Sequence, residues 1–247
     1  MTLTVPCLFG LESLVADEMR RLDLKNVRAE NGRVHCEGTL ADIARLNINL
    51  RCGARVLMEL GSFPARDFEA LFQGVYALPW EDYIPRDGEF PVKGYSLNSQ
   101  LHSVPACQSI VKKASAKRLG EKYGVETLPE TGSRYQIQFS IIKDVATLYL
   151  DTSGEGLYKR GYLAKNMGAP LRETLAAALV TLSRYRGKDP FCDPFCGSGT
   201  IPIEAALIAK NRAPGLDRSF AAQKWKNMDS KLWLEAGDEA MDKEFHG

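Results

Sequence analysis

The residues best suited to chemistry form one stretch, Asp193-Pro194-Phe195-Cys196-Gly197-Ser198-Gly199-Thr200. A helical run at 171–185 precedes it, and an apolar run at 201–209 that predicts a second helix follows it. We interpret the stretch as an acidic residue that ends a short apolar strand, a glycine turn and a helix start. A parallel α/β sheet presents a cofactor site in this way at the carboxyl end of its first strand. Glycine is required where the backbone takes positive φ or where a ligand approaches the main chain.

The spacing of the glycines excludes two common phosphate-binding loops. A dinucleotide fold would show G-x-G-x-x-G, and a P-loop would show G-x-x-x-x-G-K-[ST]. Gly197-Ser198-Gly199 lacks the third dinucleotide glycine, and no lysine follows it. A loop without cations that follows Asp193 suits a ligand with an amino acid end and a nucleoside, such as S-adenosylmethionine. The alternative is a tight strand-turn-helix connection that binds no ligand.

The whole stretch resembles the first cofactor motif of the class I S-adenosylmethionine-dependent methyltransferases, in the form found in members that methylate amino groups. The resemblance implies that Glu204 supports the loop from the following helix. It also implies, more weakly, that Ala169–Thr174 packs beside the cofactor, although a plain core helix explains the alanines there equally well. The cofactor-binding residues that it implies are Asp193, Pro194, Phe195, Gly197, Ser198, Gly199, Thr200, Glu204 and Thr174.

Composition limits which partners, locations and metal sites we expect. The chain has 247 residues and a net charge of +1, so a nucleic acid would have to meet a local basic patch. We expect no signal peptide, no membrane span and a cytoplasmic location. The six cysteines form no C-x-x-C pair and there are only three histidines, so we expect no metal site. Cys192 and Cys196 are expected to be small buried side chains in a reducing compartment.

The first unit that the pattern predicts covers residues 1–60 and has an architectural role. Apolar residues at helical spacing predict a helix over 11–22, and Asn31-Gly32 predicts a hairpin within 27–36. Thr39 fits an N-cap for the next helix, and 55–60 predicts a strand.

The second unit covers residues 61–154. Asp67 caps a predicted helix through 77, and 90–96 predicts a short strand and turn. Residues 105–123 form the most basic predicted helix, with Lys112, Lys113, Lys117, Arg118 and Lys122 against the single acid Glu121. Residues 135–142 and 145–151 predict a hairpin that turns at Lys143-Asp144. From charge alone, a solvated helix face is the commoner explanation of such a helix.

Two segments of this unit, Val92–Ser96 and Ser103–Ala114, resemble the THUMP domain, an RNA-binding module of RNA-modifying enzymes. The resemblance implies an RNA partner, with ribosomal RNA as our expectation. The RNA-binding residues that it implies are Lys93, Ser96, Gln108, Lys112, Lys113, Lys117 and Arg118.

Taken together, the resemblance implies an α/β protein with an α+β amino-terminal part. We expect a ferredoxin-like domain at 1–60, a THUMP domain at 61–154 and the amino-terminal part of a Rossmann-like class I methyltransferase domain at 155–247. Gly154-Glu155-Gly156 is the expected linker between the last two.

Two parts of the family pattern are missing. Amino-methylating members carry N-P-P-Y or D-P-P-Y, and this sequence contains neither. Residues 201–247 are also too few for the remaining strands and crossover helices of a doubly wound sheet. We therefore expect a truncated chain without catalytic residues of its own, inactive alone, whose target-base residues would lie beyond Gly247.

The leading hypothesis is an RNA methyltransferase, or its amino-terminal fragment, that transfers a methyl group to an exocyclic amine of a flipped base. The loop 211–220 resembles that of the large-subunit rRNA guanine methyltransferases, which implies guanine N2 as the target. Two alternatives stay open: an adenine-specific DNA methyltransferase, and a non-catalytic RNA-binding fragment. The sequence does not determine the oligomeric state.

Overall fold

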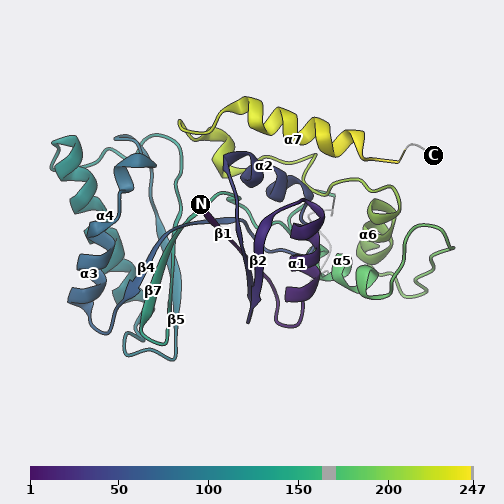
Figure 1. The fold of residues 1–247 in the computed structure, drawn as a ribbon, viewed down its shortest axis with the longest axis horizontal. Helices are drawn as coiled ribbons and strands as arrows, with labels where there is room; N and C mark the ends of the chain where they lie inside the picture. The colour runs from purple at the N-terminus through teal and green to yellow at the C-terminus, as the bar shows by residue number, and fades with distance from the viewer. Residues whose placement is uncertain (163–170, 246–247) are drawn as a thin grey trace. The chain divides into compact units, whose positions relative to one another are not determined.

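The computed structural model describes residues 1–162 and 171–245, and the chain divides into two compact units (Figure 1). Unit 1 comprises Met1–Val56, Ser153–Gln223 and Asp229–Gly247. Unit 2 comprises Leu57–Thr152 and Lys224–Met228. The backbone therefore passes between the units four times, and the first 56 residues belong to the same unit as most of the residues after 152.

Unit 1 begins with a three-stranded antiparallel arrangement in the order β2-β3-β1, in which β3 pairs with both neighbours. The helix α1 packs against β2 and β3, with Val15 and Met19 fully buried beneath it. The elements of this part are β1 (Thr2–Pro6), α1 (Glu12–Arg21), β2 (Lys25–Glu30), β3 (Arg33–Glu37) and α2 (Leu40–Asn49). The predicted helix at 11–22 and the hairpin around Asn31-Gly32 are therefore confirmed.

The start of α2 follows from local sequence chemistry. The hydroxyl of Thr39 accepts from the Asp42 N–H, and the Asp42 carboxylate accepts from the Thr39 N–H at 2.9 Å, which makes a reciprocal capping box. These contacts satisfy two N–H groups at the start of the helix. The prediction of Thr39 as N-cap is confirmed.

In the rest of unit 1, the regular elements that the structure describes are the helices α5 (Glu173–Leu182), α6 (Thr200–Ala209) and α7 (Ser230–Asp242), with the short 3-10 helix Ala221–Lys224 before α7. α5 packs against α6, and α7 packs along α2. The prediction of an apolar strand ending at Asp193 is wrong, because residues 190–193 have no regular structure. A strand needs a neighbour to receive its backbone hydrogen bonds, and no strand lies after Asp151 in the described part of the chain.

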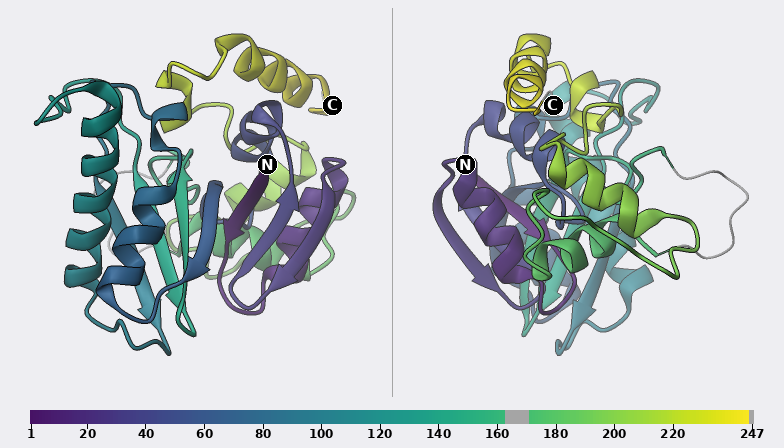
Figure 2. Two further views of the ribbon diagram at one scale, coloured as in Figure 1. Left: turned by 60° about the vertical axis from the view of Figure 1, so that its left-hand side comes forward. Right: turned by 90° about the vertical axis from the view of Figure 1, so that its right-hand side faces the viewer.

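Unit 2 is a four-stranded sheet with two helices on one face (Figures 1 and 2). The strand order is β4-β7-β6-β5, antiparallel except for the parallel pair β5 and β6. The helices α3 and α4 pack against each other beside this sheet. The elements are β4 (Leu57–Pro64), α3 (Phe68–Ala77), the short 3-10 helix Trp80–Asp82, β5 (Val92–Leu97), α4 (Val104–Tyr123), β6 (Ile137–Ile142) and β7 (Val145–Asp151).

The helix caps and turns of unit 2 follow the predictions. The Asp67 carboxylate accepts from the Ala70 N–H at 2.7 Å and so begins α3. α4 ends at Gly124, whose φ of 63° gives the left-handed cap that glycine adopts without strain. Lys143 and Asp144 both have positive φ in the turn between β6 and β7. The strand predicted at 55–60 is displaced, since β4 covers Leu57–Pro64.

The expected linker Gly154-Glu155-Gly156 is held within unit 1. The Arg218 guanidinium donates to the carbonyls of Glu155 at 2.9 Å and Gly156 at 2.8 Å, and Arg55 donates to the Gly154 carbonyl. Three carbonyls in succession thus have charged donors, so these residues form part of a packed unit.

Gly94 in β5 should tolerate no side chain. A Cβ there would lie 2.4 Å from both Cδ1 and the carbonyl oxygen of Phe139 on β6, so the strand carrying Lys93 must shift to admit it. We expect Gly94→Ala to lower the free energy of unfolding by about 1–3 kcal/mol in chemical denaturation. Gly237→Ala in α7 is the control, because nothing lies within 4 Å of its Cβ. It should be neutral or stabilising by about 1 kcal/mol. Equal effects of the two changes would contradict this packing.

Candidate cofactor loop and nucleic-acid interface

The stretch 193–200 forms an exposed loop that leads into α6. The Asp193 carboxylate accepts from the Phe195 N–H at 3.0 Å, and the Gly199 N–H donates to the Cys196 carbonyl at 2.7 Å. The Ser198 and Thr200 hydroxyls are 2.7 Å apart. These local bonds fix the turn and place Gly199 as the N-cap of α6.

The two glycines of the loop are required by backbone conformation. Gly197 has φ 52° and Gly199 has φ 76°, the left-handed region that other residues adopt only with strain. A Cβ at Gly197 would meet nothing within 4 Å, and one at Gly199 would meet only Ile203 Cδ1 at 3.8 Å. The space above the loop is therefore open to a ligand. With a carboxylate at its start and no cation, the loop fits the amino acid end of S-adenosylmethionine better than a phosphate.

Phe195 and Pro194 lie on the outside of this loop. The Phe195 side chain is 93% exposed, and Pro194 is also exposed. Within the described residues no ring contact involves Phe195. The ring is thus presented beside the open glycines.

Glu204 lies one turn into α6 and is completely buried. It forms an ion pair with Arg160, whose side chain is 1% exposed, and it accepts from the Tyr162 hydroxyl at 2.5 Å. Burial raises the pKa of the Glu204 carboxyl, while Arg160 and Tyr162 act in the opposite direction. Glu204 therefore acts on the loop from inside the core, by fixing α6, and has no open face toward a ligand.

The same arginine reaches a second segment of unit 1. Arg160 also donates to the Arg51 carbonyl, so one guanidinium joins α6 to the chain that follows α2. Thr174, in the first turn of α5, is 7% exposed, on a helix that packs against α6. Of the weaker assignment to Ala169–Thr174, Ala169 and Pro170 lie outside the described residues.

The expectation that Cys192 and Cys196 are buried is wrong. Both are exposed free cysteines, because they flank a loop at the surface of the described residues. Cys36, Cys52 and Cys107 are buried and free. Within the described residues, no group of three or more His, Cys, Asp or Glu could hold a metal ion.

On α4, Lys112 is engaged in internal contacts. Its ammonium lies 2.7 Å and 2.8 Å from the two carboxylate oxygens of Glu130 and donates to the Phe90 carbonyl at 3.1 Å. It also lies 3.3 Å from the centroid of the Phe90 ring. A lysine with its charge compensated in this way is poorly placed to bind phosphate.

Arg118 is engaged as well. Its Nη2 and Nε donate to the two carboxylate oxygens of Glu81 at 2.6 Å and 3.0 Å, a bidentate pair. The Arg118 guanidinium lowers the pKa of Glu81 to about 2. Lys122 lies 3.5 Å from the same carboxylate. One carboxylate therefore offsets part of the positive charge at this end of α4.

The remaining predicted RNA residues differ in accessibility. Lys113 is exposed, and none of the ion pairs found among the described residues involves it. Lys117 is exposed, 3.9 Å from Glu121 and 5.5 Å from the Tyr76 ring centroid. Lys93 is exposed on the edge strand β5. Ser96 has a buried hydroxyl without a partner, and Gln108 donates to the Val92 carbonyl at 3.3 Å. The accessible cations of this set are Lys93, Lys113 and Lys117.

Sequence reasoning missed the Arg160, Tyr162 and Glu204 cluster as a unit. Arg160 and Tyr162 stand in a segment whose charges resemble a solvated linker, and Glu204 is 44 residues from Arg160. A glutamate in the otherwise apolar run Ile201–Ala209 was the only available signal, since a buried acid requires a partner.

Three family models match consecutive parts of the chain. They are described as the RlmL ferredoxin-like domain at residues 2–57, the THUMP domain at 65–151, and the RMKL-like methyltransferase domain at 160–244. The chain therefore contains a ferredoxin-like part, a THUMP part and a methyltransferase part in that order. None of the described helices is long and apolar enough to cross a lipid bilayer.

The chain is similar over nearly its whole length to larger proteins. It is 45% identical over 244 residues to "Putative RNA methyltransferase YpsC" of Bacillus subtilis, covering 98% of this chain and 63% of that protein. It is 35% identical to "Ribosomal RNA large subunit methyltransferase K/L" of Psychromonas ingrahamii, covering 93% of this chain and 31% of that protein. The solved structure of SMU.472, "a putative methyltransferase complexed with SAH", matches with 42% identity and a TM-score of 0.93, covering 99% of this chain and 65% of that chain. The chain thus spans less than two thirds of each of these proteins.

The ion pair of Glu81 and Arg118 should make the free energy of unfolding depend on pH in the acidic range. Because the folded-state pKa of Glu81 is lowered from 4.5 to about 2, its contribution is present above pH 4.5 and is lost as pH falls toward 2. We expect Glu81→Gln to lower the free energy of unfolding at pH 7, with a difference from wild type that shrinks at pH 3. Urea denaturation at both pH values measures this. A difference that stays constant would show that the charge of Glu81 is not responsible.

Proposed function

We infer that this chain, a member of the RNA methyltransferase family that joins ferredoxin-like, THUMP and RMKL-like methyltransferase domains, binds S-adenosylmethionine at the 193–200 loop and RNA through unit 2. The observation that carries the cofactor assignment is the open loop at the start of α6. It combines a carboxylate at Asp193, two glycines with positive φ and free space above them.

The proposed roles divide among the loop residues. Asp193 would face the positive amino end of the cofactor, and the backbone from Gly197 to Thr200 would lie along it. Phe195, with its ring exposed, offers an apolar surface beside that backbone. Thr174 and Glu204 are buried and would support α5 and α6, on which the loop depends. S-adenosylmethionine, when bound, would supply an electrophilic methyl group for the acceptor amine.

On the RNA side, Lys93, Lys113 and Lys117 are the proposed phosphate contacts. They are exposed, whereas Lys112 and Arg118 hold Glu130 and Glu81. Ser96 and Gln108 would act locally around β5. Phosphate contacts of this kind position RNA without reading its sequence. Recognition of a base would have to come from residues other than these.

The finer assignments are also proposals. We propose large-subunit ribosomal RNA as substrate, which the name of the Psychromonas relative supports. We propose guanine N2 as the acceptor, on the resemblance of the loop 211–220. With ribosomal RNA as the substrate, we also propose a cytoplasmic location. We propose domain limits of 1–60, 61–154 and 155–247.

A second candidate is an RNA-binding polypeptide without methyltransferase activity. The observation in its favour is the absence of N-P-P-Y or D-P-P-Y from the sequence. On that reading, RNA binding survives while methyl transfer by this chain is absent. The two candidates share unit 2 and differ in the use of the 193–200 loop.

The cofactor proposal is tested by calorimetric titration with S-adenosylmethionine. We expect wild-type binding in the micromolar range and a loss of about tenfold or more for Asp193→Asn, because a charge-assisted contact is removed. Asp189→Asn is the matched control, since Asp189 is an exposed carboxylate just before the loop. It should bind like wild type.

Equal affinity of the Asp193→Asn and Asp189→Asn variants for S-adenosylmethionine would show that Asp193 does not contact the cofactor. No binding by the folded wild-type chain would contradict the cofactor proposal for this polypeptide and favour the non-catalytic candidate.

The RNA proposal is tested by the salt dependence of binding to a fluorescein-labelled RNA hairpin. We expect Lys113→Gln to weaken binding and to reduce the slope of log K against log salt by about 1, because one phosphate contact is lost. Lys231→Gln, a similarly exposed lysine on α7, should leave the slope unchanged. Lys112→Gln should lower the melting temperature, because Lys112 holds Glu130, and should leave the salt slope of RNA binding nearly unchanged. A wild-type salt slope for Lys113→Gln would show that Lys113 does not contact an RNA phosphate.

A further inference from the structure

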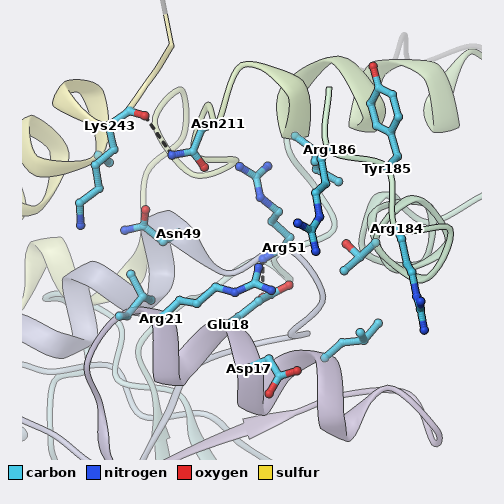
Figure 3. Close-up of a pocket in the computed structure, with 15 residues that line it drawn as sticks. Asp17, Glu18, Arg21, Asn49, Arg51, Arg184, Tyr185, Arg186, Asn211 and Lys243 are labelled. Atoms are coloured by element: carbon cyan, nitrogen blue, oxygen red, sulfur yellow. Dashed lines mark hydrogen bonds between the residues drawn. The ribbon is translucent and has the colours of Figure 1, made fainter. Parts of the chain in front are cut away.

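Unit 1 contains a cavity of about 880 Å³ away from the 193–200 loop. Five segments of the chain meet there: α1, the residues just after α2, the end of α5, the end of α6 and the end of α7 (Figure 3). None of the loop residues 193–200 lines it. The cavity is therefore separate from the proposed cofactor site.

Cations dominate the wall of this cavity. Figure 3 shows Arg21 and Arg186 extending into it from different segments, α1 and the chain after α5. The full set of cationic residues on the wall is Arg21, Arg51, Arg184, Arg186 and Lys243. Such a cluster from segments far apart in sequence creates a local positive field on a chain whose net charge is only +1.

The two acids on the wall are already engaged. Asp17 pairs with Arg20 at 2.8 Å. Glu18 accepts from the backbone N–H groups of Arg51 at 2.9 Å and Cys52 at 3.3 Å. Neither acid forms a side-chain pair with the arginines of the wall in the described structure.

Among the cations, Lys243 pairs with Glu239 at 2.6 Å. The four arginines differ, since no ion pair is found for any of them within residues 1–162 and 171–245. Four arginines without an ion pair around one cavity repel one another, and an anion would relieve that repulsion.

Arg51 gives a second, independent observation, a buried N–H group that has no hydrogen-bond acceptor in the described structure. Its Nη2 donates to the Arg212 carbonyl at 2.9 Å, while its Nη1 is buried without a partner. Burial lowers the pKa of the Arg51 guanidinium, the charge of Glu18 opposes this shift, and the charge of Arg160 adds to it. A buried guanidinium with an unsatisfied N–H and no ion pair is costly, so an anion in the adjacent cavity would stabilise it.

We propose that this cavity binds phosphate groups of an RNA strand, with Arg21 and Arg186 as direct contacts and Arg51 as a supporting charge. The inference rests on the proposed RNA methyltransferase function and adds a second RNA contact, on unit 1. The chemistry favours a phosphodiester backbone over a nucleotide. The one aromatic ring on the wall, Tyr185, packs edge-on against Phe191 with centroids 5.0 Å apart. The cavity therefore has charge for phosphates and no free ring for a base.

The test compares the double variant Arg21→Gln/Arg186→Gln with wild type in binding the fluorescein-labelled RNA hairpin at several salt concentrations. We expect about a tenfold or larger loss of affinity, and a reduction of the salt slope by about 2, because each lost duplex phosphate contact removes about 0.9. The control is Lys25→Gln/Arg28→Gln, two exposed cations on β2 with the same change of charge. It should keep the wild-type slope.

Further arms separate this inference from other outcomes. Arg21→Lys/Arg186→Lys should restore most of the slope, and thermal melting must show that all variants fold. A loss of RNA affinity without a change of slope would assign the arginines a structural role and overturn the inference. Binding of inorganic pyrophosphate that depends on the two arginines, with unchanged RNA binding, would identify a small-anion site instead. If the wild-type chain binds no RNA, the proposed function itself is contradicted. If the wild-type chain binds RNA and the Arg21→Gln/Arg186→Gln variant binds it equally well, only this inference is contradicted.

Discussion

Unit 1 depends on a buried ion pair. Arg160 and Glu204 are both inaccessible to solvent, and Arg160 also holds the Arg51 carbonyl while Tyr162 donates to Glu204. Removing one member of a buried pair leaves an uncompensated charge, which costs about 3–5 kcal/mol. This cluster fixes α6, and α6 in turn carries the glycine loop. The geometry of the candidate cofactor site is therefore set by residues that never face a ligand.

Charge counted along a helix predicts accessibility poorly, and α4 shows why. Its lysines and arginines look alike in sequence, but Glu130 and Glu81 neutralise Lys112 and Arg118 from 18 and 37 residues away. Tertiary partners at such separations leave no periodic signal. Lys113 and Lys117 form no ion pair with either acid among the described residues, which only the folded structure reveals.

The elements best predicted from sequence were those governed by local chemistry. Thr39, Asp67 and Asn31-Gly32 each act within a few residues, so their caps and turn are as expected. The strand before Asp193 was predicted from an apolar pattern, yet strand formation depends on a neighbouring strand elsewhere in the fold. The prediction that Cys192 and Cys196 are buried was wrong for the same reason, because the exposure of a segment depends on which other elements pack over it.

The path of the chain between the units bears on the order in which the protein folds during synthesis. The sheet of unit 2 is complete once residue 151 has left the ribosome. Unit 1 must wait longer, because its first 56 residues are held by Arg160, which donates to the Arg51 carbonyl, and by Glu239, which pairs with Arg45. Contacts so distant in sequence form slowly. During this interval α2 lacks α7, its partner in the finished fold, so the face of α2 that α7 covers is open to chaperones and to aggregation.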